Sequence, residues 1–161
     1  MITTILSLLW FLLIIAVIVT VGTNSRKKNS LDFQNFGIVD VPYVTMDIQG
    51  KQFNMIVDTA CGASILHTKS LMESEIEFNM TGDSLNFSSL TDENVRTKAV
   101  VVEFELNGML ISEIFYLYDS DTNFGDFSER YGITIHGLLG SDFLDSHRCK
   151  VDYATHKLTV R

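Results

Sequence analysis

Cysteine is scarce in this sequence, and its histidines are scattered along the chain. The 161 residues include two cysteines, Cys61 and Cys149, and four scattered histidines. Two distant cysteines are too few for a disulfide framework, and neither residue type shows the spacing of a metal site. We therefore expect two reduced, partly buried thiols, histidines at the surface or in turns, and neither a metal nor a cofactor.

Basic residues are also few outside one short cluster. The chain has 12 Lys and Arg against 20 Asp and Glu, and three of the 12 are Arg26, Lys27 and Lys28. The remainder therefore holds nine basic residues against 20 acidic ones. So large an excess of acidic residues would repel the phosphates of a nucleic acid, which excludes nucleic acid as a partner.

Charged side chains are absent from Met1 to Ser25. Roughly residues 2–22 form an apolar run that is long enough to cross a hydrocarbon core ~30 Å thick. A cleaved signal peptide is the alternative, but it would carry a basic start and a shorter apolar region of ~7–15 residues. The sequence thus predicts a transmembrane helix within residues 1–23, by which the chain binds a membrane.

The basic cluster at residues 26–28 directly follows this run. Positive residues beside a membrane helix favour the cytoplasmic side. We therefore expect a single-pass membrane protein whose soluble domain lies in the cytoplasm, in keeping with its sparing use of cysteine.

Beyond the membrane segment, the composition changes twice. Residues 24–36 are polar without a sustained period and are predicted to be a linker, and residues 37–161 have the size of one domain with one core. Several short runs in which apolar and polar residues alternate follow one another, and hairpin turns are predicted at Gly50-Lys51 and Asn107-Gly108. A short helix or turn is expected at residues 64–72. About eight or nine short strands and little helix predict an all-β sandwich or barrel.

Asp58 is the first candidate for a functional residue. It ends the apolar run Met55–Val57 and precedes the small residues 59–64. Small residues after a charged strand end let another chain or a substrate approach the backbone closely. An ordinary strand-to-turn junction, with the aspartate capping the turn, is the alternative.

Two segments together resemble the retropepsin-like aspartyl protease family. They are IVDTACGASIL around Asp58 and, about 80 residues later, GLLGSDFL. The family has apolar-apolar-Asp-Thr-Gly-Ala-Ser and then apolar-apolar-Gly-x-Asp-Phe-Leu in this order and spacing, and the terminal KVDYATHKLTV is similar to its closing hairpin. The resemblance covers roughly residues 38–161. It implies a closed β-barrel or sandwich lobe with one short helix, whose second motif contains Gly137, Leu139, Gly140 and Asp142.

The segment after Asp58 departs from the family pattern. Without a gap, Ala60 takes the place of the family's Gly, Cys61 that of its Ala, and Gly62 that of its Ser or Asp. A two-residue insertion would instead align residues 62–64 with Gly-Ala-Ser, but the gapless version keeps the apolar residues 65–66 in register. The Cβ of Ala60 is tolerable at negative φ and costly at positive φ.

The chemistry of this family needs two carboxylates. Two close carboxylates cannot both ionise, so the pair shares a proton; the ionised member activates a water and the protonated one polarises the peptide carbonyl. The chain has one Asp-Thr element and the size of one half of such a site, which predicts a homodimer with Asp58 facing its symmetry mate and a peptide or protein as substrate. By resemblance, Thr59 would hydrogen-bond across the axis.

Three further interpretations concern the surroundings of the site. Asp142 opens a short helix, so a role as N-cap or at the helix dipole is preferred to that of a second carboxylate within one chain. Residues 85–98 would form a flap over the cleft, as hairpins do there in the family. For Cys61 beside the site, a reduced thiol without a role is preferred, and sensitivity of the activity to oxidation is the alternative.

The sequence therefore predicts a membrane-anchored aspartyl endopeptidase that is active as a homodimer. Two alternatives remain. One is a catalytically inactive domain of the same fold that serves as a membrane-tethered dimerisation or binding module, and the change to Ala60 motivates it. The other is a β-barrel unrelated to proteases.

Overall fold

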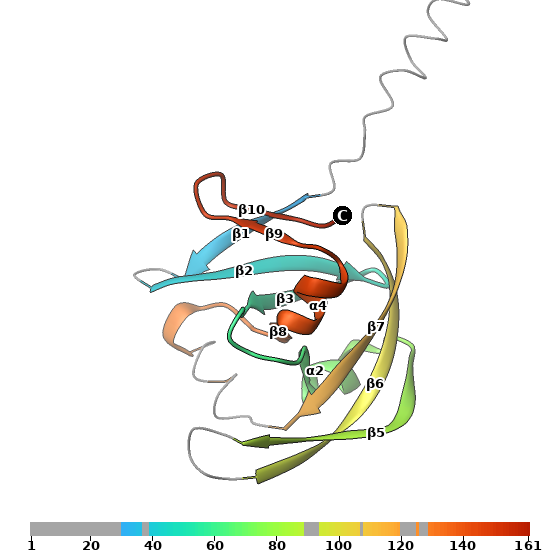
Figure 1. Cartoon of the computed structure of the whole chain (residues 1–161). Coiled ribbons are helices and arrows are strands. Elements are labelled where there is room, and N and C mark those ends of the chain that lie inside the picture. Colours follow the sequence, from blue (N-terminus) through green and yellow to red (C-terminus); the bar gives the residue numbers. More distant parts are fainter. Residues whose placement is uncertain (1–29, 37–38, 89–93, 107, 120–124, 126–128) are drawn as a thin grey trace, which may run out of the picture.

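The computed structural model describes residues 30–36, 39–88, 94–106, 108–119, 125 and 129–161 (Figure 1). Its elements are β1 (Ser30–Phe36), β2 (Val39–Ile48), β3 (Lys51–Val57), β4 (Ile65–His67), α2 (Thr68–Ser74), β5 (Phe78–Ser88), β6 (Asn94–Leu106), β7 (Met109–Tyr118), β8 (Gly137–Leu139), α4 (Ser141–Ser146), β9 (Lys150–Asp152) and β10 (Lys157–Thr159). The strands follow one another in one sheet in the order β5-β6-β7-β4-β8-β3-β2-β1-β10-β9. The all-β architecture expected from the sequence is confirmed.

Alternation along the strands creates the core. In β3, Phe53, Met55 and Val57 are buried while the residues between them are partly exposed, because successive side chains of a strand point to opposite faces. The buried residues of β2, β6 and β7 and of both helices add to the same cluster, which includes Phe104, Phe115, Leu71 and Phe143. This large cluster supports most of the sheet, and a second, smaller cluster contains Tyr43 and Ile135.

The turn between β2 and β3 consists of Gln49 and Gly50, one residue earlier than the sequence suggested. Both have positive φ, 53° and 82°, as a two-residue hairpin turn requires, and the Oδ1 of Asp47 accepts a hydrogen bond from the Gly50 N–H at 2.8 Å. Ile48 and Lys51 form the last pair of the ladder. The error arose because glycine marks a turn without fixing its place in it.

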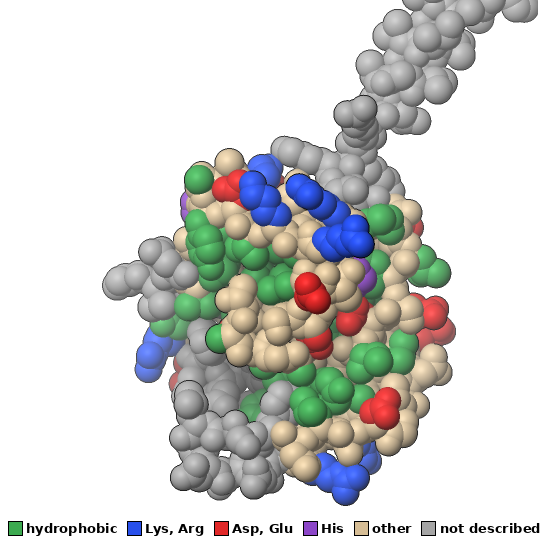
Figure 2. All heavy atoms as spheres, viewed as in Figure 1, with side chains coloured by type: hydrophobic (Ala, Val, Ile, Leu, Met, Phe, Trp, Pro, Cys, Tyr) green, Lys and Arg blue, Asp and Glu red, His purple; other side chains and the backbone are tan. Residues whose placement is uncertain are grey.

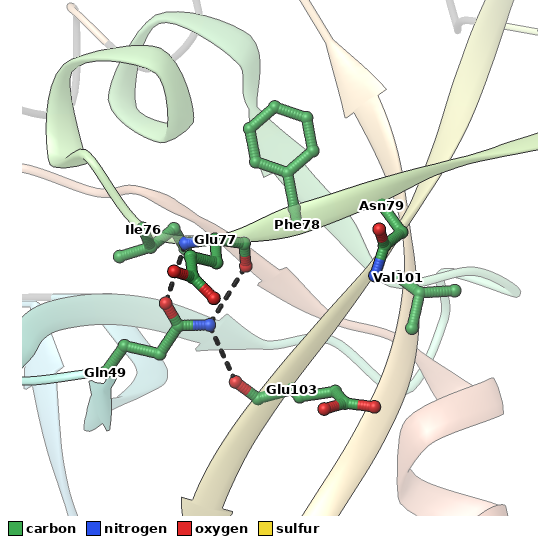
Figure 3. A pocket seen from close by; sticks show the side chains of 7 residues that line it. All are labelled: Gln49, Ile76, Glu77, Phe78, Asn79, Val101 and Glu103. Atoms are coloured by element: carbon green, nitrogen blue, oxygen red, sulfur yellow. Dashed lines mark hydrogen bonds between the residues drawn. The ribbon is translucent and has the colours of Figure 1, made fainter.

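The side chain of Gln49 connects this turn to the strands on the far side of the sheet (Figure 3). Its Oε1 accepts from the Glu77 N–H at 2.7 Å, and its Nε2 donates to the carbonyl oxygens of Glu77 and Glu103, both at 2.9 Å. The amide thus bonds three backbone groups at the edge of a hollow of about 460 Å³. Because backbone groups already bond to both the oxygen and the nitrogen of the Gln49 amide, this side chain is not free to bind a ligand in the hollow. We therefore assign Gln49 a structural role.

The arrangement around β8 positions the candidate site. β8 lies between β3, to which it is parallel, and β4, to which it is antiparallel; Leu138 is paired with Ile56 on one side and with Ile65 on the other. The chain therefore leaves β3, passes over the end of β8 through residues 58–64, and returns as β4 on the opposite side (Figure 1). One short strand from a distant part of the sequence, β8, thereby fixes both ends of the loop that contains Asp58.

The N-terminal boundary of the domain corrects the predicted linker. Residues 30–36, expected within the linker 24–36, form β1, which pairs with β10 through Leu31 and Leu158 and with β2 through Phe33 and Val44. Phe33 is 3% exposed. These partners lie up to 127 residues away in sequence, so the local polarity of the segment concealed them.

The predicted transmembrane helix, residues 1–23, lies outside the described residues. Within the described ranges, no helix combines the length and the apolar character needed to cross a bilayer.

Candidate active site

Asp58 lies where β3 ends beside β8. Its backbone N–H donates to the carbonyl oxygen of Leu139 at 3.0 Å, which continues the β3–β8 pairing by one bond. Its Oδ1 accepts a hydrogen bond from the Ala60 N–H at 2.9 Å, and the residue is half-buried. The carboxylate is therefore held against its own loop at the end of a central strand, as in an Asx turn, while it remains accessible to solvent.

The loop accommodates Ala60 without backbone strain. Among the described residues other than glycine, positive φ occurs at Gln49, Glu75, Arg148 and His156, and so not at Ala60. Ala60 and Thr59 are exposed. The condition under which a Cβ at this position would be costly is therefore not met.

Gly62 is not sterically constrained to be glycine. Its φ is not positive, and a Cβ added there would meet no atom within 4 Å. The structure gives no steric reason for glycine at this position. Gly137 and Gly140 differ, because an added Cβ would lie 2.1 Å from the carbonyl oxygen of Ile65 in the first case and 2.6 Å from that of Ala63 in the second.

Asp142 anchors the far end of the loop. Its Oδ2 accepts from the Ser64 N–H at 2.8 Å, and its Oδ1 accepts from the Ser64 hydroxyl and the Phe143 N–H, both at 2.7 Å. The Ser64 oxygen in turn accepts from the Gly140 N–H at 2.9 Å. Ser64 is fully buried. The network joins the loop after Asp58 to the start of α4 across 78 residues of sequence.

Of the two roles expected for Asp142, that of N-cap is wrong. The N-cap of α4 is Gly140, and Asp142 lies in the first turn of the helix. This position agrees with the expected role at the helix dipole, and the carboxylate accepts hydrogen bonds both from Phe143 within the helix and from Ser64 outside it. Ser64, for its part, does not start the helix expected at residues 64–72; that helix is α2, and its N-cap is His67. The sequence contained no signal for the Ser64–Asp142 pair, since neither residue type is unusual at a strand end.

We expect Asp142→Asn to lower the free energy of unfolding by about 1–3 kcal/mol. An amide has one acceptor oxygen, so in either orientation its NH₂ group faces the N–H of Ser64 or that of Phe143. Chemical denaturation of the purified protein measures the effect. Asp145→Asn, an exposed change on the same helix, is the control and should stay within about 0.5 kcal/mol. Equal stability of the two variants would contradict the role of the network.

A hollow of about 550 Å³ opens beside the loop. It is lined by Ala60, Cys61, Gly62, Ala63, Leu85, Tyr116 and Asp142. Leu85 comes from the hairpin of β5 and β6, where it pairs with Thr97. The segment 85–98, predicted to form a flap, thus belongs to a hairpin that reaches this hollow, and the residues 89–93 lie outside the described ranges.

Cys61 lies in the wall of the hollow with its thiol turned to the protein. Burial raises the pKa of the Cys61 thiol, and the carboxylates of Asp58 and Asp142 act in the same direction. The thiol donates a hydrogen bond to the Ala63 carbonyl oxygen at 3.1 Å. The protonated thiol is therefore favoured, and the thiolate is the form that oxidants attack. This environment argues against the oxidation sensitivity that the sequence suggested for Cys61.

The histidines are less peripheral than expected. His67 is buried in β4, at 7% exposure, and the His136 Nδ1 accepts from the Asn54 N–H at 2.9 Å. Burial, followed by the proximity of His67, lowers the pKa of His136. Both side chains belong to the packing around β8. In the part of the chain that the structure describes, no three side chains of His, Cys, Asp or Glu are grouped to hold a metal ion.

Comparison with known proteins finds similarity at the level of structure and not of sequence. No protein-family model matches the sequence, and no curated protein matches it. A crystal structure of the retroviral protease-like domain of Ddi1 from Leishmania major is similar, with 15% sequence identity over 74% of this chain and 87% of that one, at a TM-score of 0.49. A score of this size is too low to assign a fold.

Proposed function

We propose that this protein is a membrane-anchored aspartyl endopeptidase that acts as a homodimer. The observation that carries the proposal is the position of Asp58. It follows β3, is bonded to Leu139 of β8, and begins a loop that Asp142 fixes at its other end. Such a loop holds a carboxylate in a defined place at an accessible edge, as the two segments that resemble the retropepsin-like family would require.

The reaction needs a second carboxylate, and Asp142 is poorly suited to supply it. Both its oxygens already accept hydrogen bonds from Ser64 and Phe143. A second copy of Asp58, brought by a twofold axis, meets the requirement with the same geometry on both sides. The pair would share one proton: the ionised carboxylate takes a proton from water, and the protonated one hydrogen-bonds to the scissile carbonyl.

The neighbouring groups have supporting roles in this proposal. Thr59 is exposed beside Asp58, where its hydroxyl would hydrogen-bond to the partner loop. Leu85 and Tyr116 give the hollow an apolar side that suits a side chain of an extended peptide substrate. The β5–β6 hairpin would cover that peptide as a flap.

The apolar run at residues 2–22 would tether the domain to a bilayer, with the domain on the cytoplasmic side. Two chains confined to one membrane meet at a higher effective concentration than in free solution. The tether would then promote assembly of a weak dimer and limit the substrates to those near the same surface.

Dilution tests the dimeric site. We expect the full-length chain in detergent to cleave a peptide library, with a rate per chain that falls as the chain is diluted below its dimerisation constant. In proteoliposomes, the rate per chain should depend on protein density in the bilayer and hardly on bulk dilution. Dimers that cleave no peptide between about pH 4 and 8 would instead favour the inactive binding module.

A further inference from the structure

Basic residues gather at one end of the domain. Arg148, Lys150, Lys157 and Arg161 all belong to β9, β10 or the residues beside them, and we call these four the basic end. They are four of the nine Lys and Arg that follow residue 28, and the last 14 residues hold a single acidic side chain. Figure 2 shows Lys and Arg side chains together over the end of the molecule that β9 and β10 form in Figure 1.

The remainder of the domain has the opposite charge. Residues 30–147 hold five basic and 19 acidic side chains. Local ion pairs reduce the charge of the basic end only in part: Lys150 lies 3.1 Å from Asp152 and remains 63% exposed, and Lys157 lies 3.1 Å from Asp32. Arg148 and Arg161 are exposed. The domain therefore has a positive end and a negative remainder. Near an anionic surface, this separation of charge would turn the basic end towards the surface.

The same end receives the chain from its N-terminal segment. Ser30, the first described residue, pairs with Thr159 of β10. The apolar run ends near Gly22, and the eight Cα–Cα steps from Gly22 to Ser30 can span about 28 Å at most. If that run lies in a bilayer, the basic end is the part of the domain that its covalent connection holds nearest to the membrane surface.

An aromatic side chain completes this surface. Tyr153, in the turn between β9 and β10, is 56% exposed although its ring packs edge-on against Phe33 with 5.6 Å between centroids. Tyrosine is enriched where proteins meet the headgroup region, because its ring is apolar and its hydroxyl is polar. A second copy of the chain is a poor occupant, because a twofold axis would bring the same positive residues face to face.

We propose that the basic end, together with Tyr153, is a docking surface for anionic phospholipid headgroups. The inference rests on the membrane tether of the proposed function, but not on catalysis. Contact through this end holds β9 and β10 against the bilayer, and it leaves the β5–β6 hairpin, at the other end of the strand order, away from it. The tether alone would permit any orientation, whereas this contact selects one.

Tryptophan fluorescence tests the contact in the full-length chain. Trp10 is the only tryptophan, so Trp10→Phe with Tyr153→Trp places a single reporter in the β9–β10 turn. The chain is reconstituted in nanodiscs of phosphatidylcholine alone or with about 30% phosphatidylserine. We expect emission at shorter wavelength and stronger quenching by brominated lipid only with phosphatidylserine, and reversal in about 0.5 M NaCl, because salt screens surface charges.

Matched variants separate the basic end from net charge. Arg148→Gln with Arg161→Gln should remove most of the spectral shift, whereas Lys51→Gln with Lys69→Gln, which removes two exposed positive charges elsewhere, should leave it. Identical spectra in both lipid mixtures would overturn the proposal. A shift with soluble inositol hexakisphosphate and none with phosphatidylserine would also overturn it, in favour of a soluble polyanion.

The tether and the docking surface can fail separately. If the chain does not remain with the nanodiscs without detergent, the tether is wrong, and binding of the same reporter to free phosphatidylserine vesicles then tests the basic end alone. If the chain remains with the nanodiscs but its tryptophan emission is the same in both lipid mixtures, the tether is supported and the docking surface is wrong.

Discussion

Asp58→Asn should reduce peptide cleavage by roughly 10³-fold or more while the protein folds as before, since general acid–base catalysis alone contributes about 10²–10⁴-fold. An amide can neither take a proton from water nor donate one as a carboxylic acid. The fold should persist because the asparagine oxygen can still accept the Ala60 N–H that Oδ1 of Asp58 accepts at 2.9 Å. Initial rates on a peptide that the wild-type chain cleaves provide the measurement.

Two controls make this result specific. Asp145→Asn removes an exposed carboxylate from α4 and should cleave at the wild-type rate. Asp58→Asn mixed with wild-type chain should also lower the wild-type rate, because mixed dimers contain one functional carboxylate. Full activity of Asp58→Asn would eliminate the protease mechanism, and full activity of the mixture would eliminate the shared site.

The sequence predicted those parts of the fold that depend on neighbouring residues. The β2–β3 hairpin, the β6–β7 hairpin and the position of Asp58 at a strand end all follow from alternating apolar residues and turn signals. The strand β1 was missed because its stability comes from β10 and β2 rather than from its own polar sequence. Local patterns do not encode such distant pairings.

In the candidate site, too, the sequence identified what local patterns encode and missed what distant contacts decide. Asp58 and the glycines of the second segment could be identified because their spacing resembles a known family. Ser64 could not, since its importance lies in two hydrogen bonds with a carboxylate 78 residues away. For Ala60 the sequence overstated the problem. Alanine in place of the family's glycine would be costly at positive φ, but the loop does not adopt positive φ there.

The crossing of the chain over β8 depends on very close backbone contacts. Gly137 begins β8 between two neighbours: it pairs with Met55 of β3 and with Leu66 of β4. Both neighbours are buried and hydrogen-bonded into the sheet, so neither strand can retreat without breaking pairs on its other side. The absence of a side chain at Gly137 is therefore a condition for placing the Asp58 loop.

Gly137→Ala should accordingly destabilise the domain by more than about 4 kcal/mol or prevent folding. The added Cβ would lie 2.1 Å from the Ile65 carbonyl oxygen and 2.9 Å from the Met55 Cε. The methionine side chain can move, but the carbonyl cannot do so without displacing β4. Thermal unfolding followed by circular dichroism measures the loss, and the yield of folded protein reports a complete failure.

Gly82→Ala is the matched control, because a Cβ there meets no atom within 4 Å and the φ of Gly82 is not positive. It should be neutral or slightly stabilising, by up to about 1 kcal/mol. Gly140→Ala, where the nearest backbone atoms lie at 2.6 Å, should show a smaller loss than Gly137→Ala and keep the measurement informative if the latter does not fold. A Gly137→Ala protein that unfolds at the wild-type temperature would contradict the packing of β8 between β3 and β4, and with it the geometry that fixes Asp58.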